Sequence, residues 1–243
     1  MTNVTPQLLE SVQKEFNTLL ANDLQYLRII KAIENGNLSW AIANQYSIRV
    51  GELLSLALTN NITTATLPNG IFYFNIADEI LRTTLSVDYD MVSGVADRVQ
   101  QAMNEKAKIG IKPIKAEFNE NRTKGLIDKV SNAEQFSDVE WVLKEPIVNY
   151  SQSIVDDTIE ANAKFHAKAG LRVTVERTAE KGACEWCVAI AEKSPYRVSE
   201  SADIPREVFQ RHERCRCHVS YNSVRLSPYK SSRTSKYNTF RAE

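Results

Sequence analysis

Long apolar segments are missing from this 243-residue sequence, in which no run approaches the about 18 residues of a membrane-spanning helix. The amino-terminal stretch MTNVTPQLLESVQKEF lacks the apolar core of a secretory signal peptide and already has a helical pattern. We therefore expect a protein that does not enter a membrane and that folds in the reducing cytoplasm of a cell. In that compartment, paired cysteines bind metal more often than they form disulfides.

An excess of charge of one sign is missing as well, because 30 lysine and arginine residues balance 30 aspartate and glutamate residues. A chain without net charge does not bind polyanions as a whole, so any contact with nucleic acid must be local. The apolar fraction of 43% is ordinary for a protein that buries a core, and the length suits one large domain or two small ones.

The usual catalytic signatures are also absent. The sequence has three histidines, and it contains neither the H-x-E followed by P-C-x-x-C of zinc deaminases nor the H-E-x-x-H of metalloproteases. It has no glycine-rich phosphate loop, no G-x-S-x-G and no cysteine that stands apart from the others as a nucleophile. We therefore predict no enzymatic activity, no catalytic residue and no small-molecule substrate. His166, in KFHAK, is predicted to be an ordinary residue of a helix face.

Residues 1–170 have helical periodicity over most of their length, with apolar residues at three- and four-residue steps. We expect one helix over residues 6–36, followed by a second helix that is capped by Ser39. A third helix is expected to begin near Asn75 and to pause at SVDYD, residues 86–90.

A long helix is expected over residues 147–169, with Gly170 directly after it, where glycine commonly ends a helix. Its apolar face is thin, and Asp156, Asp157 and Glu160 are expected on its exposed side. After this helix the period changes to two, because LRVTVERT and, later, CHVSY alternate as half-buried strands do. Short helical pieces between these strands complete a small module of mixed α and β structure.

All four cysteines lie in two short stretches of this module, CEWC and HERCRC. A structural zinc site needs four tetrahedral nitrogen or sulfur ligands, and one C-x-x-C turn supplies two of them. Five candidates are available for the four places: Cys184, Cys187, His212, Cys215 and Cys217. The metal takes either all four cysteines, with His212 nearby, or His212 and three cysteines, with Cys215 or Cys217 left out. The alternatives to metal are a minor core of small buried residues and a disulfide formed in an oxidising medium.

A structural Zn²⁺ has a clear purpose here, because a module of about 55 residues buries too little apolar surface to be reliably stable alone. The predicted fold class is therefore α+β: a mainly α-helical body (1–170), a small zinc-stapled α+β module (171–225) and a flexible tail (226–243). The tail is assigned as flexible because it has no periodicity and little to bury.

The segment VERTAEKGACEWCVAIAEKSPYRV, with the later PREVFQRHERCRCHVSYN, resembles the C-terminal module of the tailed-phage minor head proteins, the family of the Mu F protein. The resemblance covers roughly residues 171–222, where a strand that carries Arg172 and Arg177 precedes C-x-W-C, and H-x-x-C-x-C precedes a second strand. It is specific in order and spacing: Cys184, Trp186, Cys187, His212, Cys215 and Cys217. This chain lacks the long additional domains of some members of that family.

The resemblance implies a virion protein present in few copies, made in the host cytoplasm and located at the head near the portal vertex. Its expected role is head morphogenesis through contacts with the portal or the major capsid protein. A zinc-knuckle nucleic-acid-binding protein, or a divergent metal-dependent nuclease, is the alternative function.

The chain turns basic from Arg211 onward, with tyrosine and phenylalanine between the charges. Such a segment can contact packaged DNA through phosphates and stacking, or dock on an acidic protein surface, or simply be solvated. The basic residues assigned to DNA contact are Arg225, Lys230, Arg233, Lys236 and Arg241. Arg172 and Arg177 are expected either to bond carbonyl groups of the cysteine module or to be solvated. Trp186 is either part of the core beside the metal, which we favour, or an exposed aromatic that docks a partner.

Overall fold

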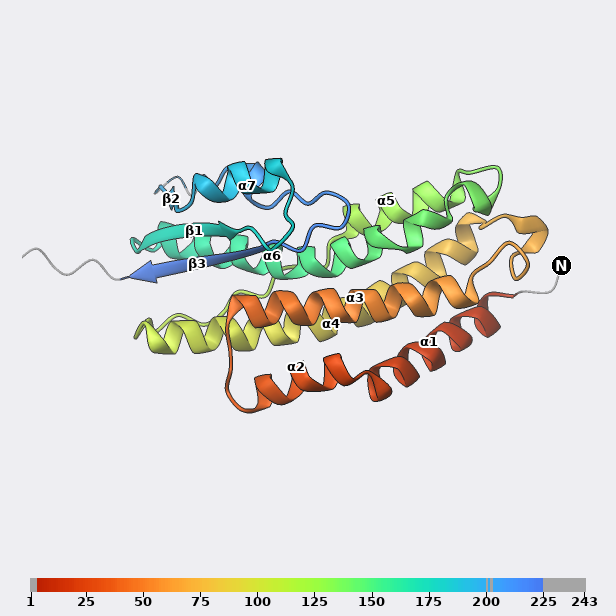
Figure 1. Ribbon diagram of the computed structural model, residues 1–243, viewed down its shortest axis with the longest axis horizontal. Helices are drawn as coiled ribbons and strands as arrows, with labels where there is room; N and C mark the ends of the chain where they lie inside the picture. The colour runs from red at the N-terminus through yellow and green to blue at the C-terminus, as the bar shows by residue number, and fades with distance from the viewer. Residues whose placement is uncertain (1–3, 200, 202, 225–243) are drawn as a thin grey trace, which may run out of the picture.

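The computed structural model describes residues 4–199, 201 and 203–224, and Figure 1 shows a bundle of long helices with a small sheet at one end. The described residues form seven α-helices, α1 to α7: Thr5–Asn22, Leu24–Glu34, Trp40–Asn61, Phe74–Lys106, Glu120–Ser131, Glu145–Lys168 and Glu185–Glu192. Four short 3-10 helices, η1 to η4, span Pro68–Gly70, Phe136–Asp138, Glu140–Leu143 and Arg206–Val208. The three strands, β1 to β3, span Arg172–Thr178, Tyr196–Val198 and His218–Val224.

The first predicted helix is wrong in one respect, because the chain breaks at Asp23 into α1 and α2. The Asp23 carboxylate accepts a hydrogen bond from the Tyr26 amide at 2.7 Å and one from the Arg49 Nε of α3 at 2.9 Å. A capping carboxylate satisfies an amide that would otherwise be free at the start of a helix. The cap predicted at Ser39 is confirmed, since its hydroxyl accepts from the Ile42 amide at 3.3 Å.

Helix α4 runs without interruption through residues 86–90, so the predicted pause is also wrong. The helix packs against α3, α5 and α6. These tertiary contacts outweigh the weak local helix propensity of the SVDYD sequence. Asp88, in the middle of that sequence, is fully buried and accepts a hydrogen bond from Ser151 of α6 at 2.8 Å.

The helices α3 and α6 form the most extensive contact between elements of the described chain. Gly51 lies at their closest approach, where a Cβ atom would be 2.6 Å from Ser151 Oγ and 2.9 Å from Val148 Cα. Helix α6 is buried on more than one side, so Asp156, predicted to be exposed, is 2% exposed. The predicted end of this helix is confirmed, with Gly170 at φ +80° directly after its last turn.

The sheet has the strand order β2-β1-β3, and both pairings are antiparallel. In β1 the alternation buries Val173, Val175 and Arg177. The two valines join the same apolar core as the long helices, and Tyr221 of β3 packs on Trp40 of α3 at a centroid distance of 6.0 Å. The apolar core is therefore continuous from the helices into the sheet, which lies against α6 (Figure 1).

The domain limits predicted from the sequence, at residues 170 and 225, stay predictions. The tail assigned to residues 226–243, including its basic residues, and Arg225 lie outside the described residues. Among the helices that are described, none combines the length and the hydropathy that a membrane span requires.

Candidate metal centre

Two chain segments bring the cysteines together. Cys184 is the residue directly before α7, and Cys187 lies in the first turn of that helix. The second segment runs from the end of η4 to the start of β3 and carries His212, Cys215 and Cys217. Because α7 packs on β1, and β1 pairs with β3, the sheet places the two segments side by side.

The five predicted ligands form two overlapping groups that share Cys187. In the first group, the His212 Nε2 atom lies 3.0 Å from the Cys187 sulfur and 3.3 Å from the Cys184 sulfur. In the second, the sulfur atoms of Cys187 and Cys215 are 3.8 Å apart, and the Cys217 sulfur lies within 4.8 Å of both. Cys187 therefore belongs to both groups, and each group could hold a metal ion.

The imidazole of His212 is oriented by the backbone. Its Nδ1 atom lies 2.7 Å from the Glu213 carbonyl oxygen, which can only accept a hydrogen bond. Nδ1 therefore donates, and in the neutral ring the lone pair of Nε2 points toward the two sulfur atoms. Trp186 packs edge-to-face on this ring at a centroid distance of 6.0 Å. It is 40% exposed, so its predicted place in the core is wrong.

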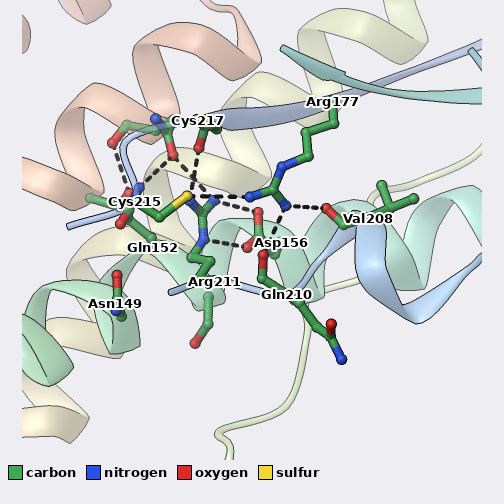
Figure 2. A network of polar contacts seen from close by, with 12 residues as sticks. Asn149, Gln152, Asp156, Arg177, Val208, Gln210, Arg211, Cys215 and Cys217 are labelled. Carbon is green, nitrogen blue, oxygen red and sulfur yellow. Dashed lines mark hydrogen bonds and ion pairs between the residues drawn. The ribbon is translucent and has the colours of Figure 1, made fainter. Parts of the chain in front are cut away.

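Arg177 is 2% exposed, and its guanidinium lies beside the Cys215 sulfur (Figure 2). One terminal nitrogen donates to the carbonyl oxygens of Val208 and Gln210 at 2.6 and 2.9 Å. The other donates to the sulfur atoms of Cys215 and Cys187 at 3.2 and 3.6 Å. Of the two alternatives predicted for Arg172 and Arg177, Arg177 bonds carbonyl groups, whereas Arg172 is exposed.

The three buried cysteines have different acidities. The pKa of Cys215 is lowered, because Cys217 donates a hydrogen bond to its sulfur and the guanidinium groups of Arg211 and Arg177 lie close. The pKa of Cys217 is raised by that same hydrogen bond and by burial. Burial also raises the pKa of Cys187, although the hydrogen bond from Arg177 lowers it in part. The nearby guanidinium groups thus favour a thiolate within the Cys215–Cys217 pair.

A second buried arginine, Arg211, joins this segment to the helical body (Figure 2). Its Nε and one terminal nitrogen donate to the two oxygens of Asp156 in α6 at 2.7 and 2.8 Å, and both side chains are 3% exposed. Its other terminal nitrogen donates to the Cys217 carbonyl oxygen at 2.8 Å. The ion pair therefore holds the backbone of a candidate ligand against α6.

Two side-chain amides of the helical body donate hydrogen bonds to backbone carbonyl groups in the segment that carries His212, Cys215 and Cys217. Asn149 donates to the His212 carbonyl oxygen at 3.1 Å, and Asn44 donates to the Arg216 carbonyl oxygen at 3.3 Å. The Arg216 side chain in turn donates to the two oxygens of Glu145 at 3.0 and 3.2 Å. These contacts fix the loop around the ligands from the side of α3 and α6.

The sequence did not identify Asn44, Asn149 and Asp156 as part of this region. Its one signal was the thin apolar face of α6, since a long helix with few apolar residues must bury polar ones if it is covered on several sides. The remaining histidines lie elsewhere: His218 Nδ1 is 3.0 Å from the Glu180 carboxylate, and His166 Nδ1 is 3.0 Å from the Ser223 hydroxyl.

Comparison with protein-family models, with curated proteins and with solved structures finds no match for this chain. The order of its cysteine and histidine residues and the geometry of their cluster are what bears on its function.

Proposed function

We propose that the chain is a non-enzymatic structural protein, a minor head protein of a tailed bacteriophage, with one structural Zn²⁺ in its cysteine cluster. The observation that carries this proposal is the convergence of five ligand atoms on Cys187, in the residue order C-x-W-C and H-x-x-C-x-C. The proposed role is assembly of the head, through contacts with the portal or the major capsid protein.

The donor set supports zinc as the metal. Thiolate and imidazole ligands suit Zn²⁺, which binds sulfur at about 2.3 Å and nitrogen at about 2.0 to 2.1 Å in a tetrahedron. Two sulfur ligands of such a tetrahedron lie about 3.8 Å apart. The sulfur atoms of Cys187 and Cys215 have this separation, 3.8 Å.

The surroundings support a structural and not a catalytic site. A catalytic zinc keeps one position open to water and has a base directed at it. Here Cys187, Cys215 and Cys217 are buried, and Arg177 lies against two of their sulfur atoms. The carboxylate of Glu213, adjacent to His212, is exposed and lies 3.8 Å from the Arg214 side chain. No histidine or carboxylate of the described residues is hydrogen-bonded to a cysteine sulfur except His212.

The described start of the basic segment is engaged largely within the protein itself. Arg211 and Arg216, which the sequence presented as the start of a basic segment, are engaged by Asp156 and Glu145. Arg214 is the remaining arginine of that stretch, and it is 80% exposed at its side chain. Within residues 211–216, one exposed arginine is too little for the multiple phosphate contacts on which sequence-independent DNA binding depends, so any such contact would rest on the basic residues from Arg225 onward.

Metal analysis tests the first part of the proposal. Purified full-length protein is expected to contain one zinc per chain, and Cys184→Ser combined with Cys187→Ser to contain none. A wild-type protein without stoichiometric zinc, after reconstitution with zinc under reducing conditions, would contradict the metal assignment.

Co-expression tests the second part. We expect the chain to elute from gel filtration in a complex with the portal or the major capsid protein encoded in the same phage genome. Retention on duplex DNA at moderate salt, without a complex with either protein, would favour the zinc-knuckle alternative. A hydrolytic activity that the double cysteine variant loses while its helical content is unchanged would overturn the non-enzymatic role.

A further inference from the structure

We propose that the metal ion has three thiolate ligands and one imidazole ligand: Cys184, Cys187, Cys215 and His212. Cys217 then stays off the metal, and Arg177 is the buried counter-charge of the site. The inference rests on the proposed zinc site and specifies which of its five candidate ligands bind.

His212 has the orientation of a ligand. The hydrogen bond from its Nδ1 to the Glu213 carbonyl oxygen, 2.7 Å long, leaves Nε2 without a proton in the neutral ring. A backbone carbonyl that orients the ring in this way is the recurrent partner of metal-bound histidines in proteins. Nε2 lies 3.3 Å from the Cys184 sulfur and 3.0 Å from the Cys187 sulfur, near the about 3.6 Å expected between nitrogen and sulfur ligands of one zinc.

Cys215 is better placed than Cys217 to be the fourth ligand. Its sulfur lies 3.8 Å from that of Cys187, and one nitrogen of Arg177 donates to both of these sulfur atoms. Donation from a guanidinium is strongest toward an ionised acceptor. Among the described residues, no guanidinium donates to the Cys217 sulfur, and Arg211 bonds the Cys217 backbone carbonyl instead. Neither Cys215 nor Cys217 forms one close group with Cys184 and His212, so Cys187 is the ligand that joins the two groups.

The balance of charge agrees with three thiolates. Zn²⁺ with three thiolates and a neutral imidazole has a net charge of minus one, which the guanidinium of Arg177 neutralises. Four thiolates would leave an excess negative charge at a site where Cys184 is exposed but Cys187, Cys215 and Cys217 are buried, and the buried part carries a desolvation penalty. Arg177 is 2% exposed and forms no ion pair with a carboxylate within the described ranges. The other buried guanidinium, that of Arg211, is already neutralised by Asp156.

The ligand set can be measured on the unaltered protein. We expect X-ray absorption at the zinc edge to fit a shell of three sulfur atoms and one nitrogen in the zinc-loaded full chain. A shell of four sulfur atoms would overturn the inference and leave the proposed zinc site standing. A wild-type chain that binds no zinc at all would defeat the proposed site itself, so the two failures are distinct.

Cys217→Ser and Cys215→Ser form a matched pair of variants, because each replaces one buried sulfur by oxygen in the same loop. We expect Cys217→Ser to bind one zinc with an affinity within about threefold of wild type, and Cys215→Ser and His212→Ala to lose more than about 100-fold. Zinc affinity is measured by competition with a chromophoric chelator, and far-ultraviolet circular dichroism reports whether each variant keeps its helices. Loss of zinc in Cys217→Ser with retention in His212→Ala would overturn the proposed set.

Arg177→Gln tests the counter-charge separately. Glutamine can still donate a hydrogen bond but has no charge, and we expect zinc affinity to fall about 10- to 100-fold with the three-sulfur, one-nitrogen shell unchanged. An affinity equal to that of wild type would show that the charge of Arg177 plays no part in the site.

Discussion

At the scale of single residues, buried polar groups set the largest expected effects in this protein. Asp88 is the clearest case outside the metal cluster, because it is fully buried and its Oδ1 has no hydrogen-bond partner among the described residues. Burial raises the pKa of Asp88 to about 7, although the hydrogen bond from Ser151 opposes this shift. The carboxyl group is therefore neutral in the folded protein under mildly acidic conditions.

This pKa predicts how stability depends on pH. The folded state keeps a proton on Asp88 up to about pH 7, whereas the unfolded chain releases it near its ordinary value of 3.8. The folded state thus binds more protons in this interval, and the free energy of unfolding falls as the pH rises from about 4 to 7.

Asp88→Asn removes this titration while keeping a neutral polar group of the same shape. We expect the variant to be about as stable as wild type at pH 4 and more stable at pH 8, by on the order of 3–4 kcal/mol. Urea unfolding at both pH values measures the difference. A stability difference that does not change with pH would contradict the assignment.

The buried ion pair between Arg211 and Asp156 gives a second prediction. Arg211→Met leaves the Asp156 carboxylate buried without a cation, which we expect to lower the free energy of unfolding by about 3–5 kcal/mol. Adding Asp156→Leu removes the stranded charge, and the double variant is expected to be more stable than Arg211→Met alone. A double-mutant cycle by urea unfolding makes the comparison, and additive effects of the two changes would refute the coupling.

At the scale of elements, the contact between α3 and α6 depends on a missing side chain. Gly51→Ala places a methyl group 2.9 Å from the Val148 Cα, a backbone atom that cannot move aside alone. We expect a loss of about 1–3 kcal/mol in the free energy of unfolding, the usual range for overpacking.

Gly94→Ala in α4 is the matched control for this substitution, because a Cβ atom there meets no atom within 4 Å. It is expected to stabilise the protein by about 0.5–1 kcal/mol through the better helix propensity of alanine. Thermal unfolding of the two variants in parallel measures both effects. Equal shifts in the two variants would show that the close approach at Gly51 is not limiting.

The sequence predicted most helices and strands but not the tertiary contacts between them. Periodicity located α3, α6 and the strands β1 and β3, because their apolar spacing and their flanking residues, Ser39 and Gly170, agree with one another. It did not predict the break at Asp23, because the carboxylate that caps α2 depends on Arg49 of another helix. It placed the pause in α4 wrongly for the same reason, since tertiary contacts decide there.

The sequence predicted the candidate metal ligands, but it did not predict the residues that hold the ligand loop against the helices. C-x-x-C and H-x-x-C-x-C consist of the residue types that bind metal. In the structure, the five candidate residues form two groups that share Cys187. Asp156 was assigned to the exposed side of α6 because a charged residue beside a thin apolar stripe is usually solvated. Its burial follows from Arg211, which lies 55 residues further along the chain, beyond the reach of a local pattern.

At the scale of the whole molecule, the proposed metal joins segments that the helical body already holds. Asn149, Asn44 and Arg211 bond the ligand loop without any metal, and the core is continuous from the helices into the sheet. The proposed metal would therefore stabilise the loop together with the helical body, and its removal would leave the contacts of the body in place.

Metal removal is therefore expected to have a local effect. In the presence of a chelator, amide hydrogen exchange should rise in residues 179–217, while α3, α4 and α6 remain protected. Zinc at 1,000 times its dissociation constant contributes about 4 kcal/mol of stability, so the melting temperature should fall as well. The double cysteine variant is the control, because a chelator should not change it further. A loss of protection throughout the helices would contradict this picture.

The separation of the two halves of the cluster along the chain has a consequence during synthesis on the ribosome. Cys184 and His212 are 28 residues apart, which at about 5–20 residues per second corresponds to a delay of about 1–6 seconds. In that interval a nascent chain presents CEWC alone, a two-thiolate half-site, next to helices that have already emerged. With the proposed zinc site, tight binding needs ligands from HERCRC, so the ion would bind tightly only after this segment has been translated.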